Sequence, residues 1–203
     1  MSQITVTKTE IEGLLIIEPT IHRDERGFFA EFYNEKDFAE AGISTRFVQD
    51  NASRSTKGVL RGLHFQKHYP QAKLVRASRG TVFDVVVDIR KNSPSFGRWH
   101  GEILSEDNFR QLYVPEGLAH GYLVLSQEAE FCYKVNDFYH PGDEGGIAFN
   151  DPDIGIQWPD IIGEYPGAPA AAAYRMTDGT PLVLSPKDEK HPRLRDSWIF
   201  ESC

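Results

Sequence analysis

Cysteine is scarce in this chain of 203 residues. Cys132 and Cys203 are its two cysteines, and two such distant residues provide neither a disulfide framework nor the spacing of a zinc site. Long apolar runs are missing too, since no stretch approaches the roughly 20 residues that span a membrane. The N-terminal residues MSQITVTKTEIEG lack the basic-then-apolar layout of a signal peptide. We therefore expect a cytoplasmic protein without a membrane segment.

Positive charge is in the minority, with 22 Lys and Arg against 30 Asp and Glu and a net charge of -8. That balance argues against a general nucleic-acid binder, although a local basic cluster still permits an anionic small ligand. The sequence also lacks a GxGxxG or P-loop phosphate motif and the GxSxG turn of a serine nucleophile. With these motifs absent, any catalytic or binding site must be built from polar residues elsewhere in the chain.

The chain does contain many short β-branched or aromatic segments separated by Gly, Pro, Asn and Asp. Such closely spaced strands predict an antiparallel sandwich or barrel rather than βαβ units. One short helix is expected in NEKDFAEAG, where Asn34 caps the start and Gly42 follows the end. We predict one domain over 1–203, with an N-terminal arm over about 1–50 and a C-terminal excursion and tail over about 160–203. The Gly-, Pro- and Ala-rich residues 163–181 receive no role.

Alternation along the strands turns several polar side chains inward. In VLRGLHFQ one face carries Leu60, Gly62, His64 and Gln66. The same reasoning turns a second set toward the interior, consisting of Lys73, Asp84 and Tyr133. An isolated strand histidine or tyrosine is more often structural than catalytic, so the indication comes from the combination. Together these residues predict a polar set inside an otherwise apolar β-structure.

A metal site is the main chemical alternative for a barrel of this kind. Such barrels often carry a His-x-His pair with a further Glu and His, but Gln66 stands two residues after His64. His68 lies near a proline, in an expected turn, and His120 offers at most one ligand. These histidines are too few for a site with metal-like spacing. We therefore expect neither a metal nor another cofactor.

Nine segments, taken together, resemble one protein family. In chain order they are DERGFF, FVQDN, VLRGLHFQ, KLVR, VFDVVVDIRKNSPSFGRW, VPEGLAHGY, EFCYKVNDFYHPGDEGGI, NDPDIGIQWP and LSPKD. They cover nearly the whole chain and resemble the dTDP-4-dehydrorhamnose 3,5-epimerases. The resemblance implies a mainly β, cupin-type jelly-roll barrel (an antiparallel β-sandwich) with a few short helices and no metal. It also implies an isomerase that converts dTDP-4-dehydro-6-deoxy-D-glucose to dTDP-4-dehydro-L-rhamnose in dTDP-L-rhamnose biosynthesis.

The resemblance assigns chemical roles to a few residues. Both inverted carbons, C3 and C5, lie next to the C4 ketone, so the reaction needs a base on one face, an acid on the other and a group that stabilises the enolate. His64 matches the base, and Asp188 matches the carboxylate that orients it. Tyr133 matches the acid. Lys73 is expected beside the enolate oxygen, kept charged by Asp84.

A nucleotide diphosphate needs positive charge and a stacking surface. The resemblance implies that the phosphates and sugar are contacted by Arg26, Arg61, His120 and Lys187. It implies that the nucleotide or sugar is also contacted by Glu31, Gln49, Asn51 and Glu144. Tyr139 matches the aromatic ring that stacks on thymine. Strict alternation points Arg61 away from His64, unless a bulge at Gly62 turns it toward the same cavity.

The family is dimeric, so the resemblance also implies a homodimer. The segment DERGFFAEF is expected to reach the site of the partner, where Arg26, Phe29 and Glu31 act in trans. The expected ligand is a dTDP-linked 4-keto-6-deoxyhexose, and neither nucleic acid nor a membrane is an expected partner.

Three alternative functions remain for the same residues. One base and one acid would equally serve a 3-only or 5-only epimerase, or a keto-isomerase, on a related dTDP-4-keto-6-deoxysugar. A metal-dependent cupin and a non-catalytic sugar-nucleotide binder are more distant alternatives. A pure binder has no need of an acid and a base on opposing walls, which disfavours the last of these.

Overall fold

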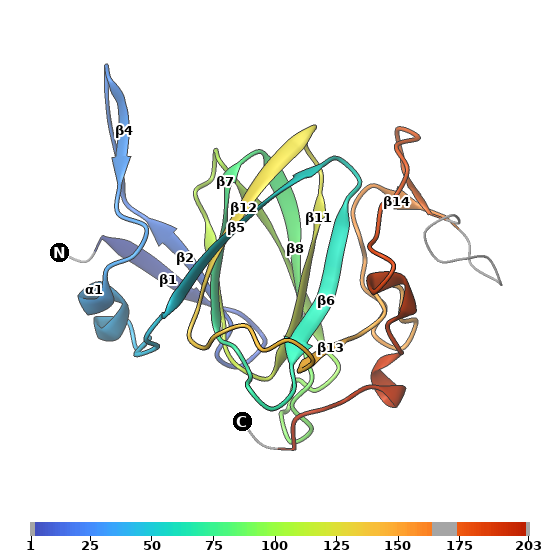
Figure 1. Cartoon of the computed structure of the whole chain (residues 1–203). Helices are drawn as coiled ribbons and strands as arrows, with labels where there is room; N and C mark the ends of the chain where they lie inside the picture. The colour runs from blue at the N-terminus through green and yellow to red at the C-terminus, as the bar shows by residue number, and fades with distance from the viewer. Residues whose placement is uncertain (1–2, 164–173, 202–203) are drawn as a thin grey trace.

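Two antiparallel β-sheets face each other at the centre of the computed structural model, which describes residues 3–163 and 174–201 (Figure 1). In spatial order, the first sheet consists of β1 (Ile4–Lys8), β2 (Leu15–Pro19), β10 (Gln111–Val114), β7 (Lys73–Arg79), β12 (Glu128–Val135) and β5 (Gln49–Thr56). The second consists of β13 (Glu144–Gly146), β6 (Leu60–Gln66), β11 (Leu118–Val124), β8 (Thr81–Asp88) and β9 (Trp99–Ser105). This arrangement confirms the predicted mainly β jelly roll in its sandwich form.

The remaining elements are short and lie outside the two sheets. They are a hairpin of β3 (Ile21–Asp24) and β4 (Gly27–Ala30), the helix α1 (Glu35–Glu40), the strand pair β14 (Ile161–Ile162) and β15 (Arg175–Met176), and the 3-10 helices η2 (Asp188–Lys190) and η3 (Leu194–Asp196). Within the described ranges no helix is long and apolar enough to cross a membrane.

Strand β8 is buried on both faces, as its apolar composition requires. Its residues Val82 and Val86 join the core between the sheets, where they meet Val75 of β7. Val85 belongs to a second core on the outer face of the sheet, together with Phe200 from the C-terminal segment. Both faces of this sheet are therefore packed against apolar side chains, and this packing positions the inward-facing Asp84 of β8.

The predicted helix forms where its caps indicate. The Asn34 side chain accepts hydrogen bonds from the backbone N–H groups of Lys36 and Asp37, at 3.0 and 3.4 Å, which satisfies donors that the first turn leaves unpaired. Gly42 follows the helix with a φ of +89°, a left-handed conformation that favours glycine. Phe38 packs the helix against the outer face of the six-stranded sheet, where it is fully buried.

The C-terminal segment docks along the five-stranded sheet. Val183 forms a parallel bridge with Val59, next to the start of β6. The Phe200 N–H donates to the Ile89 carbonyl at 3.0 Å, and the Lys91 N–H donates to the Phe200 carbonyl at 2.8 Å. These contacts hold η2 beside β6. Of the Gly-, Pro- and Ala-rich stretch 163–181, residues 164–173 lie outside the described residues.

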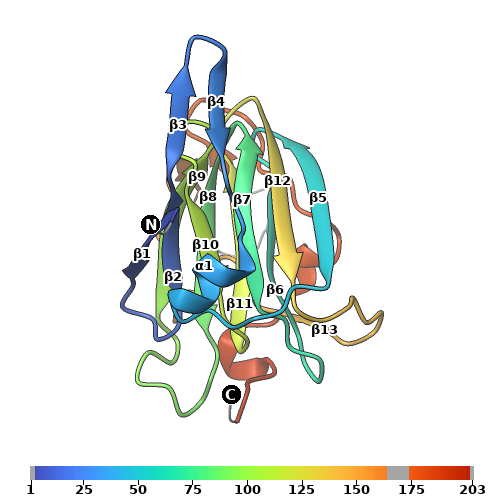
Figure 2. The same ribbon diagram turned by 90° about the vertical axis from the view of Figure 1, so that its left-hand side faces the viewer.

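The β3–β4 hairpin extends beyond the sandwich (Figures 1 and 2). Phe28 and Phe29 at its centre are 53% and 68% exposed, which is unusual for large apolar side chains. Arg26 at the turn pairs with the neighbouring Asp24. The hairpin therefore presents exposed aromatic rings and an arginine–aspartate pair to its surroundings.

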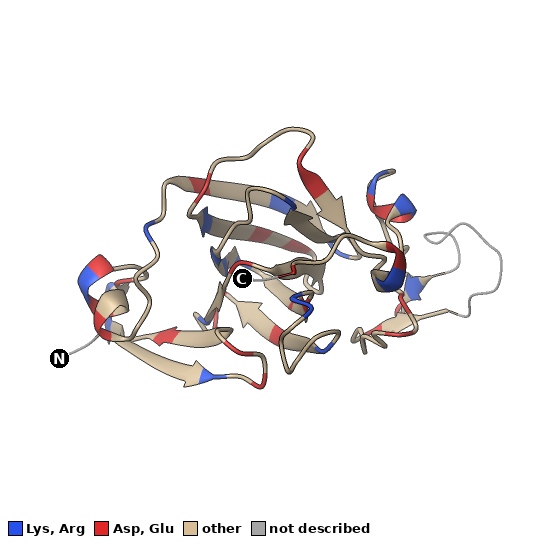
Figure 3. Ribbon diagram, turned by 90° about the horizontal axis from the view of Figure 1, so that it is seen from below, with Lys and Arg blue, Asp and Glu red and all other residues tan. Residues whose placement is uncertain are grey.

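Acidic and basic residues are interspersed along the ribbon (Figure 3). Several pair across strand boundaries, as where Arg110 contacts Glu18 of β2 and Glu102 of β9 at 2.9 and 2.8 Å. Partly exposed pairs of this kind contribute little stability individually. Because the basic residues are spread among acidic ones and the net charge is -8, an anionic ligand would have to be held by a few cations gathered within one site.

Candidate active site

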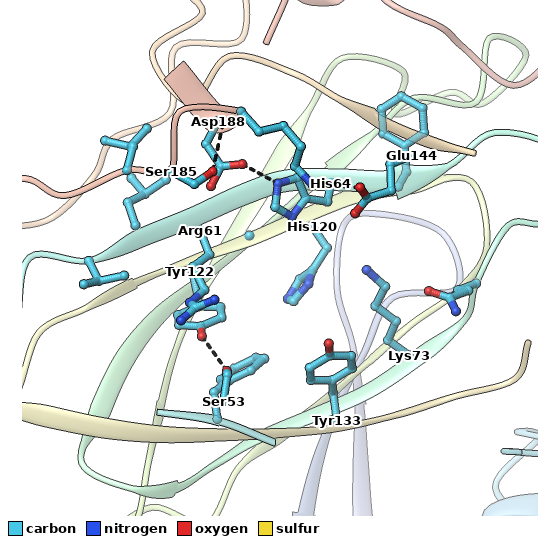
Figure 4. Close-up of a pocket in the computed structure, with 18 of the residues that line it drawn as sticks. Ser53, Arg61, His64, Lys73, His120, Tyr122, Tyr133, Glu144, Ser185 and Asp188 are labelled. Carbon is cyan, nitrogen blue, oxygen red and sulfur yellow. Dashed lines mark hydrogen bonds and ion pairs between the residues drawn. The ribbon is translucent and has the colours of Figure 1, made fainter. Parts of the chain in front are cut away.

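A cavity of about 560 Å³ opens between the two sheets, a size within the usual range for small-molecule sites. Figure 4 shows polar side chains from opposite walls pointing into it. Most of the predicted site residues line this cavity, namely Arg61, His64, Lys73, His120, Tyr133, Tyr139, Glu144, Lys187 and Asp188. Residues that lie far apart in the sequence thus meet in one place.

His64 and Asp188 form a hydrogen-bonded pair on one wall. His64 Nε2 lies 2.6 Å from Asp188 Oδ1, although the residues are 124 positions apart. Burial opposes ionisation of Asp188, which is 3% exposed, but the adjacent His191 and His64 imidazoles lower its pKa below the usual range. Because an ionised carboxylate only accepts hydrogen bonds, His64 Nε2 carries the proton. In the neutral ring the basic lone pair is then on Nδ1.

The surroundings of His64 keep it neutral near physiological pH. Burial lowers its pKa below the usual value for histidine, while the hydrogen bond that His64 donates to Asp188 opposes that shift and the cations Lys187 and Lys73 add to it. A neutral imidazole is the form that can remove a proton. The wall therefore holds a base that is orientated by a buried carboxylate.

A bulge in β6 decides which side chains join His64. Strand β6 pairs with β11 at His64 and again at Arg61, but the two residues between them face one residue of β11, Gly121. Gly62 has a φ of +121°, and a Cβ there would lie 2.6 Å from the Cα of Gly121. Any larger residue at either position would force the strands apart.

The bulge overturns strict alternation along β6. Arg61 lines the same cavity as His64, as does Leu60, which was expected on the His64 face and also packs in an apolar cluster with Leu123. The Arg61 guanidinium donates to the Ser55 hydroxyl at 3.0 and 3.1 Å. The structure thus brings a fixed positive charge to the cavity.

Tyr133 projects from the opposite wall, on β12 (Figure 4). Burial raises its pKa, and the neighbouring Tyr122 adds to that shift while Arg61 opposes it. Its hydroxyl therefore stays protonated at neutral pH and can donate a proton. The hydroxyl group of Ser53, on β5 of the same sheet, lies 2.8 Å from that of Tyr122, on β11 of the opposite sheet, so this contact joins the two walls.

Lys73 and a buried His–Asp pair lie deeper in the site. Burial lowers the pKa of Lys73 to about 8, against the opposing attraction of Asp84 and Glu144, so most of the ammonium groups remain charged at pH 7. Asp84 was expected to pair mainly with Lys73. Its hydrogen-bond partner is instead His120, whose Nε2 lies 2.9 and 3.0 Å from the two carboxylate oxygens. Burial raises the pKa of Asp84, while His120 and Lys73 oppose this.

The mouth of the cavity combines an exposed ring with charged groups. Tyr139 is 53% exposed, and Lys187 Nζ lies 2.9 Å from Glu144 Oε2. Gln66 secures the loop that carries Tyr139, because its side chain accepts from the His140 N–H at 2.8 Å and donates to the Phe138 carbonyl at 3.2 Å. The ring is therefore presented on a supported loop.

Six predicted binding residues do not line the cavity of this chain: Arg26, Phe29, Glu31, Gln49, Asn51 and Asp84, the last of which lies behind the lining residue His120. The first two lie on or beside the β3–β4 hairpin, and Glu31 accepts a hydrogen bond from Asn34 at 3.0 Å. Gln49 donates to Asn51 at 2.8 Å and accepts from the Tyr139 N–H at 3.4 Å. Gln49 therefore reaches the edge of the site, while the hairpin residues do not.

Four residues near the cavity were missed by the sequence analysis: Ser53, Tyr122, Ser185 and His191. Tyr122 follows His120 by two positions on one strand, so alternation was sufficient to find it. Ser185 accepts from the Asp188 N–H at 3.2 Å. His191 lies 3.3 Å from Asp188 through its Nε2, and no periodic pattern marked it.

One group of three side chains in residues 3–163 and 174–201 is close enough to hold a metal ion. It consists of His64, Asp188 and His191, whose ligand atoms all lie within 4.8 Å of one another. The expectation of too few ligands rested on His64, His68 and His120 and did not include His191. Two imidazoles and a carboxylate suit a transition metal, so the candidate ligands coincide with the base and its carboxylate.

Comparison with known proteins gives consistent matches over most of the chain. The family model described as dTDP-4-dehydrorhamnose 3,5-epimerase matches residues 8–196. The dTDP-4-dehydrorhamnose 3,5-epimerase of Escherichia coli strain K12 is 51% identical over 189 residues, or 92% of each chain.

Solved structures of similar enzymes share the fold. The crystal structure of dTDP-6-deoxy-D-glucose-3,5-epimerase from Legionella pneumophila, in complex with dTDP-4-keto-L-rhamnose, is 48% identical with a TM-score of 0.83 and covers 95% of this chain and 94% of that one. A 3'-monoepimerase from Streptomyces bikiniensis, in complex with dTDP-quinovose, is 33% identical with a TM-score of 0.78 and covers 92% and 86%.

Proposed function

The chain belongs to the dTDP-4-dehydrorhamnose 3,5-epimerase family, and from that premise we propose that it inverts C3 and C5 of dTDP-4-dehydro-6-deoxy-D-glucose. The product is dTDP-4-dehydro-L-rhamnose, so the protein is an isomerase of dTDP-L-rhamnose biosynthesis. The observation that carries this function is the placement of a His64–Asp188 pair across a cavity from Tyr133, with Lys73 beside the gap (Figure 4).

The first step is removal of a proton from a carbon next to the C4 ketone. His64 Nδ1 takes the proton, and the electrons of the C–H bond form the enolate double bond while the negative charge moves to the C4 oxygen. Asp188 stabilises the resulting imidazolium through its hydrogen bond to Nε2, as in a His–Asp pair of a hydrolase. The Lys73 ammonium stabilises the oxyanion, where a cation in a buried site has its largest effect.

The second step returns a proton from the opposite face. Tyr133 donates its hydroxyl proton to the enolate carbon, which inverts the centre, and the C4 ketone re-forms. Tyr133 regains a proton from solvent and His64 releases one, so the two groups are reset for the other carbon. No electrons leave the substrate, and each inversion balances as two proton transfers.

The rest of the ligand is bound toward the mouth of the cavity. The guanidinium of Arg61 and the ammonium of Lys187 supply positive charge for the diphosphate. Tyr139 supplies an exposed ring for stacking on thymine. His120 and Glu144 contact the sugar. This division places the reacting carbons deep in the site and the nucleotide near solvent.

The β3–β4 hairpin acts in a homodimer, where it completes the site of the partner. Arg26, Phe29 and Glu31 then contact the nucleotide in trans, beside Gln49 and Asn51. Support comes from the exposure of Phe28 and Phe29, because apolar rings of this size are normally buried in an interface or a core.

A monoepimerase is the second candidate function. The 3'-monoepimerase from Streptomyces bikiniensis shares the fold at 33% identity, and one base facing one acid is sufficient for a single inversion. The higher identity to 3,5-epimerases, 51% for the enzyme of Escherichia coli, favours inversion of both carbons. A 5-only enzyme or a keto-isomerase on a related dTDP-4-keto-6-deoxysugar would use the same groups.

Product analysis decides between these candidates. The purified protein is incubated with dTDP-4-dehydro-6-deoxy-D-glucose, and proton couplings around the sugar ring are measured by NMR. We expect a product inverted at both C3 and C5. A product inverted at one carbon would identify a monoepimerase, and recovery of unchanged substrate would reject the proposed activity in favour of a binder. Metal analysis of the same active preparation, before and after a chelator, tests the metal-dependent cupin.

A further inference from the structure

A second histidine lies beside the proposed base and its carboxylate. His191 Nε2 is 3.3 Å from Asp188 Oδ1, and its ring centroid is 5.3 Å from that of His64. The His191 side chain is 10% exposed. Its Nε2 is buried and, despite the short distance to Asp188, has no hydrogen bond of acceptable geometry to any described residue. An unsatisfied buried nitrogen of this kind is costly.

The backbone around His191 is shaped to hold its ring in this position. Gly146 pairs with His64 across β13 and β6, and a Cβ at Gly146 would lie 2.2 Å from the His191 ring. The Ala148 N–H donates to the Pro192 carbonyl at 2.8 Å, which anchors the residue after His191. The ring thus occupies space that the absent side chain of Gly146 leaves free.

The three side chains form a ligand set for a transition metal. Zinc binds imidazole nitrogen and carboxylate oxygen at about 2.0–2.2 Å, so neighbouring ligand atoms lie roughly 3 Å apart. The distances of 2.6 and 3.3 Å from Asp188 Oδ1 to the two Nε2 atoms need little adjustment to meet that spacing. The Asp188 side chain is 3% exposed and lies within 3.3 Å of both Nε2 atoms, so its carboxylate is the ligand that the two imidazoles share.

We propose that His64, Asp188 and His191 form an inhibitory site for Zn²⁺ and related divalent transition metals. The metal binds His64 Nε2 in place of its proton, which moves through solvent to Nδ1. Water fills the remaining metal position, and no electron is transferred. Since Nδ1 then carries a proton, the lone pair that removes the substrate proton is lost. Metal binding stands independently of the proposed function, whereas inhibition rests on it.

Metal selectivity follows from the ligand types. Imidazole and carboxylate together suit Zn²⁺ and Co²⁺, while Mg²⁺ prefers an all-oxygen octahedron.

The binding experiment compares Zn²⁺ affinity of the metal-free protein, without substrate, by calorimetry. We expect His191→Phe, which keeps a ring but removes the ligand, to weaken Zn²⁺ binding at least about 10-fold. His100→Phe is the matched control, because His100 also has a buried Nε2 without a hydrogen bond to any described residue and lies near two carboxylates, Glu10 and Glu102. His100 is on β9, at the edge of the five-stranded sheet opposite to β13, and so lies away from the proposed metal site. Its Zn²⁺ affinity should equal that of the wild type. Unchanged affinity in His191→Phe, or lost affinity in His100→Phe, would overturn the site.

Two further measurements keep the test decisive. Co²⁺ should bind the wild type with the visible absorption of a nitrogen- and oxygen-ligated site and lose that band in His191→Phe, and Mg²⁺ should not displace it. If His191→Phe fails to fold, His191→Gln replaces it, since an amide retains polarity but is a poor metal ligand.

The activity experiment addresses inhibition separately. Each variant is compared with its own metal-free rate, and Zn²⁺ should inhibit the wild type and His100→Phe but inhibit His191→Phe only at about 10-fold higher concentration. Zn²⁺ binding without loss of rate in the wild type would overturn the inhibitory role. If the protein had no epimerase activity, the proposed function would fail and the binding experiment would still decide the metal site.

Discussion

The side chains of the cavity and those of the β3–β4 hairpin differ in how many of them find partners within one chain. In the cavity, His64 has Asp188, His120 has Asp84 and Arg61 has Ser55 as partners. On the hairpin, Phe28 and Phe29 are mostly exposed, and Arg26 contacts its near neighbour Asp24. The groups proposed for proton transfer are therefore positioned by this chain alone. Phe28 packs edge-to-face on Phe109 within the chain, yet both hairpin rings remain more than half exposed, as the proposed contact with a partner subunit requires.

This difference separates the proposed chemistry from the proposed sharing of sites. Substitutions in the cavity should lower the rate of proton transfer, whereas substitutions in the hairpin should weaken substrate binding and leave the chemical step intact. The cavity variants therefore test the proposed chemistry through kcat, and the hairpin variants test the proposed sharing of sites through KM.

The largest effect is expected for the base and its carboxylate. His64→Asn removes the proton acceptor and should lower kcat by about 10³- to 10⁴-fold. Asp188→Asn should cost a similar factor, because an amide no longer holds His64 in the tautomer with Nδ1 free. Steady-state kinetics with unchanged unfolding midpoints would support the assignment. Near wild-type turnover in either variant would show that the base lies elsewhere.

A smaller loss is expected on the opposite wall. Tyr133→Phe keeps the ring but removes the donor, so kcat for inversion should fall by about 10²-fold while KM changes little. Ser53→Ala is a matched control, since it alters the hydroxyl pair with Tyr122 and leaves the Tyr133 hydroxyl in place. A larger loss in Ser53→Ala than in Tyr133→Phe would move the acid role away from Tyr133.

The pH profile of kcat/KM should fall on both sides. His64 must be neutral, and burial lowers its pKa below the usual 6.5. Activity is therefore lost on the acidic side as the pH falls through this lowered pKa. Lys73 must be charged, and its pKa is about 8, so activity is lost as the pH rises through 8. Each limb should fall about 10-fold per pH unit. Lys73→Met should lower activity and abolish the alkaline limb, and persistence of that limb would assign it to another group.

The smallest effect on turnover is expected in the hairpin. The double variant Arg26→Ala, Phe29→Ala should raise KM by about 10-fold through lost charge and ring contacts, with kcat nearly unchanged. Complementation with His64→Asn subunits tests sharing directly. When equal amounts of the hairpin variant and the His64→Asn variant exchange subunits, half of the dimers contain one subunit of each. Each mixed dimer has one site with both an intact hairpin and an intact His64, so about a quarter of all sites should be of the wild-type kind. The mixture is assayed at a substrate concentration well below the raised KM, and failure to recover sites with the wild-type KM after subunit exchange would show that the hairpin acts in its own chain.

Regular strands made part of this site predictable from the sequence. Lys73 starts β7, away from the register shift between Ala77 and Arg79 of that strand, and Asp84 lies in β8, which pairs regularly on both sides, so their inward direction follows from period two. The face of Arg61 depended on a bulge that Gly62 permits but does not require, so strict alternation alone would have turned Arg61 away from the cavity that it lines.

Other parts of the site depend on contacts that no local pattern encodes. The approach of Asp188 to His64 requires the C-terminal segment to dock along β6 through Val59 and Val183, and the resemblance of LSPKD to a family motif supplied it. His191 owes its position to the missing side chain of Gly146, a relation between distant residues.

Solvent isotope exchange tests the central claim, that a base on one wall and an acid on the other invert the same carbons. In D₂O, the wild type should place deuterium at C3 and C5 of the inverted product. Tyr133→Phe should still exchange the substrate protons, because His64 can return deuterium to the same face, but should invert them about 10²-fold more slowly. His64→Asn should do neither. Deuterium entering C3 and C5 at the wild-type rate in His64→Asn would contradict the account.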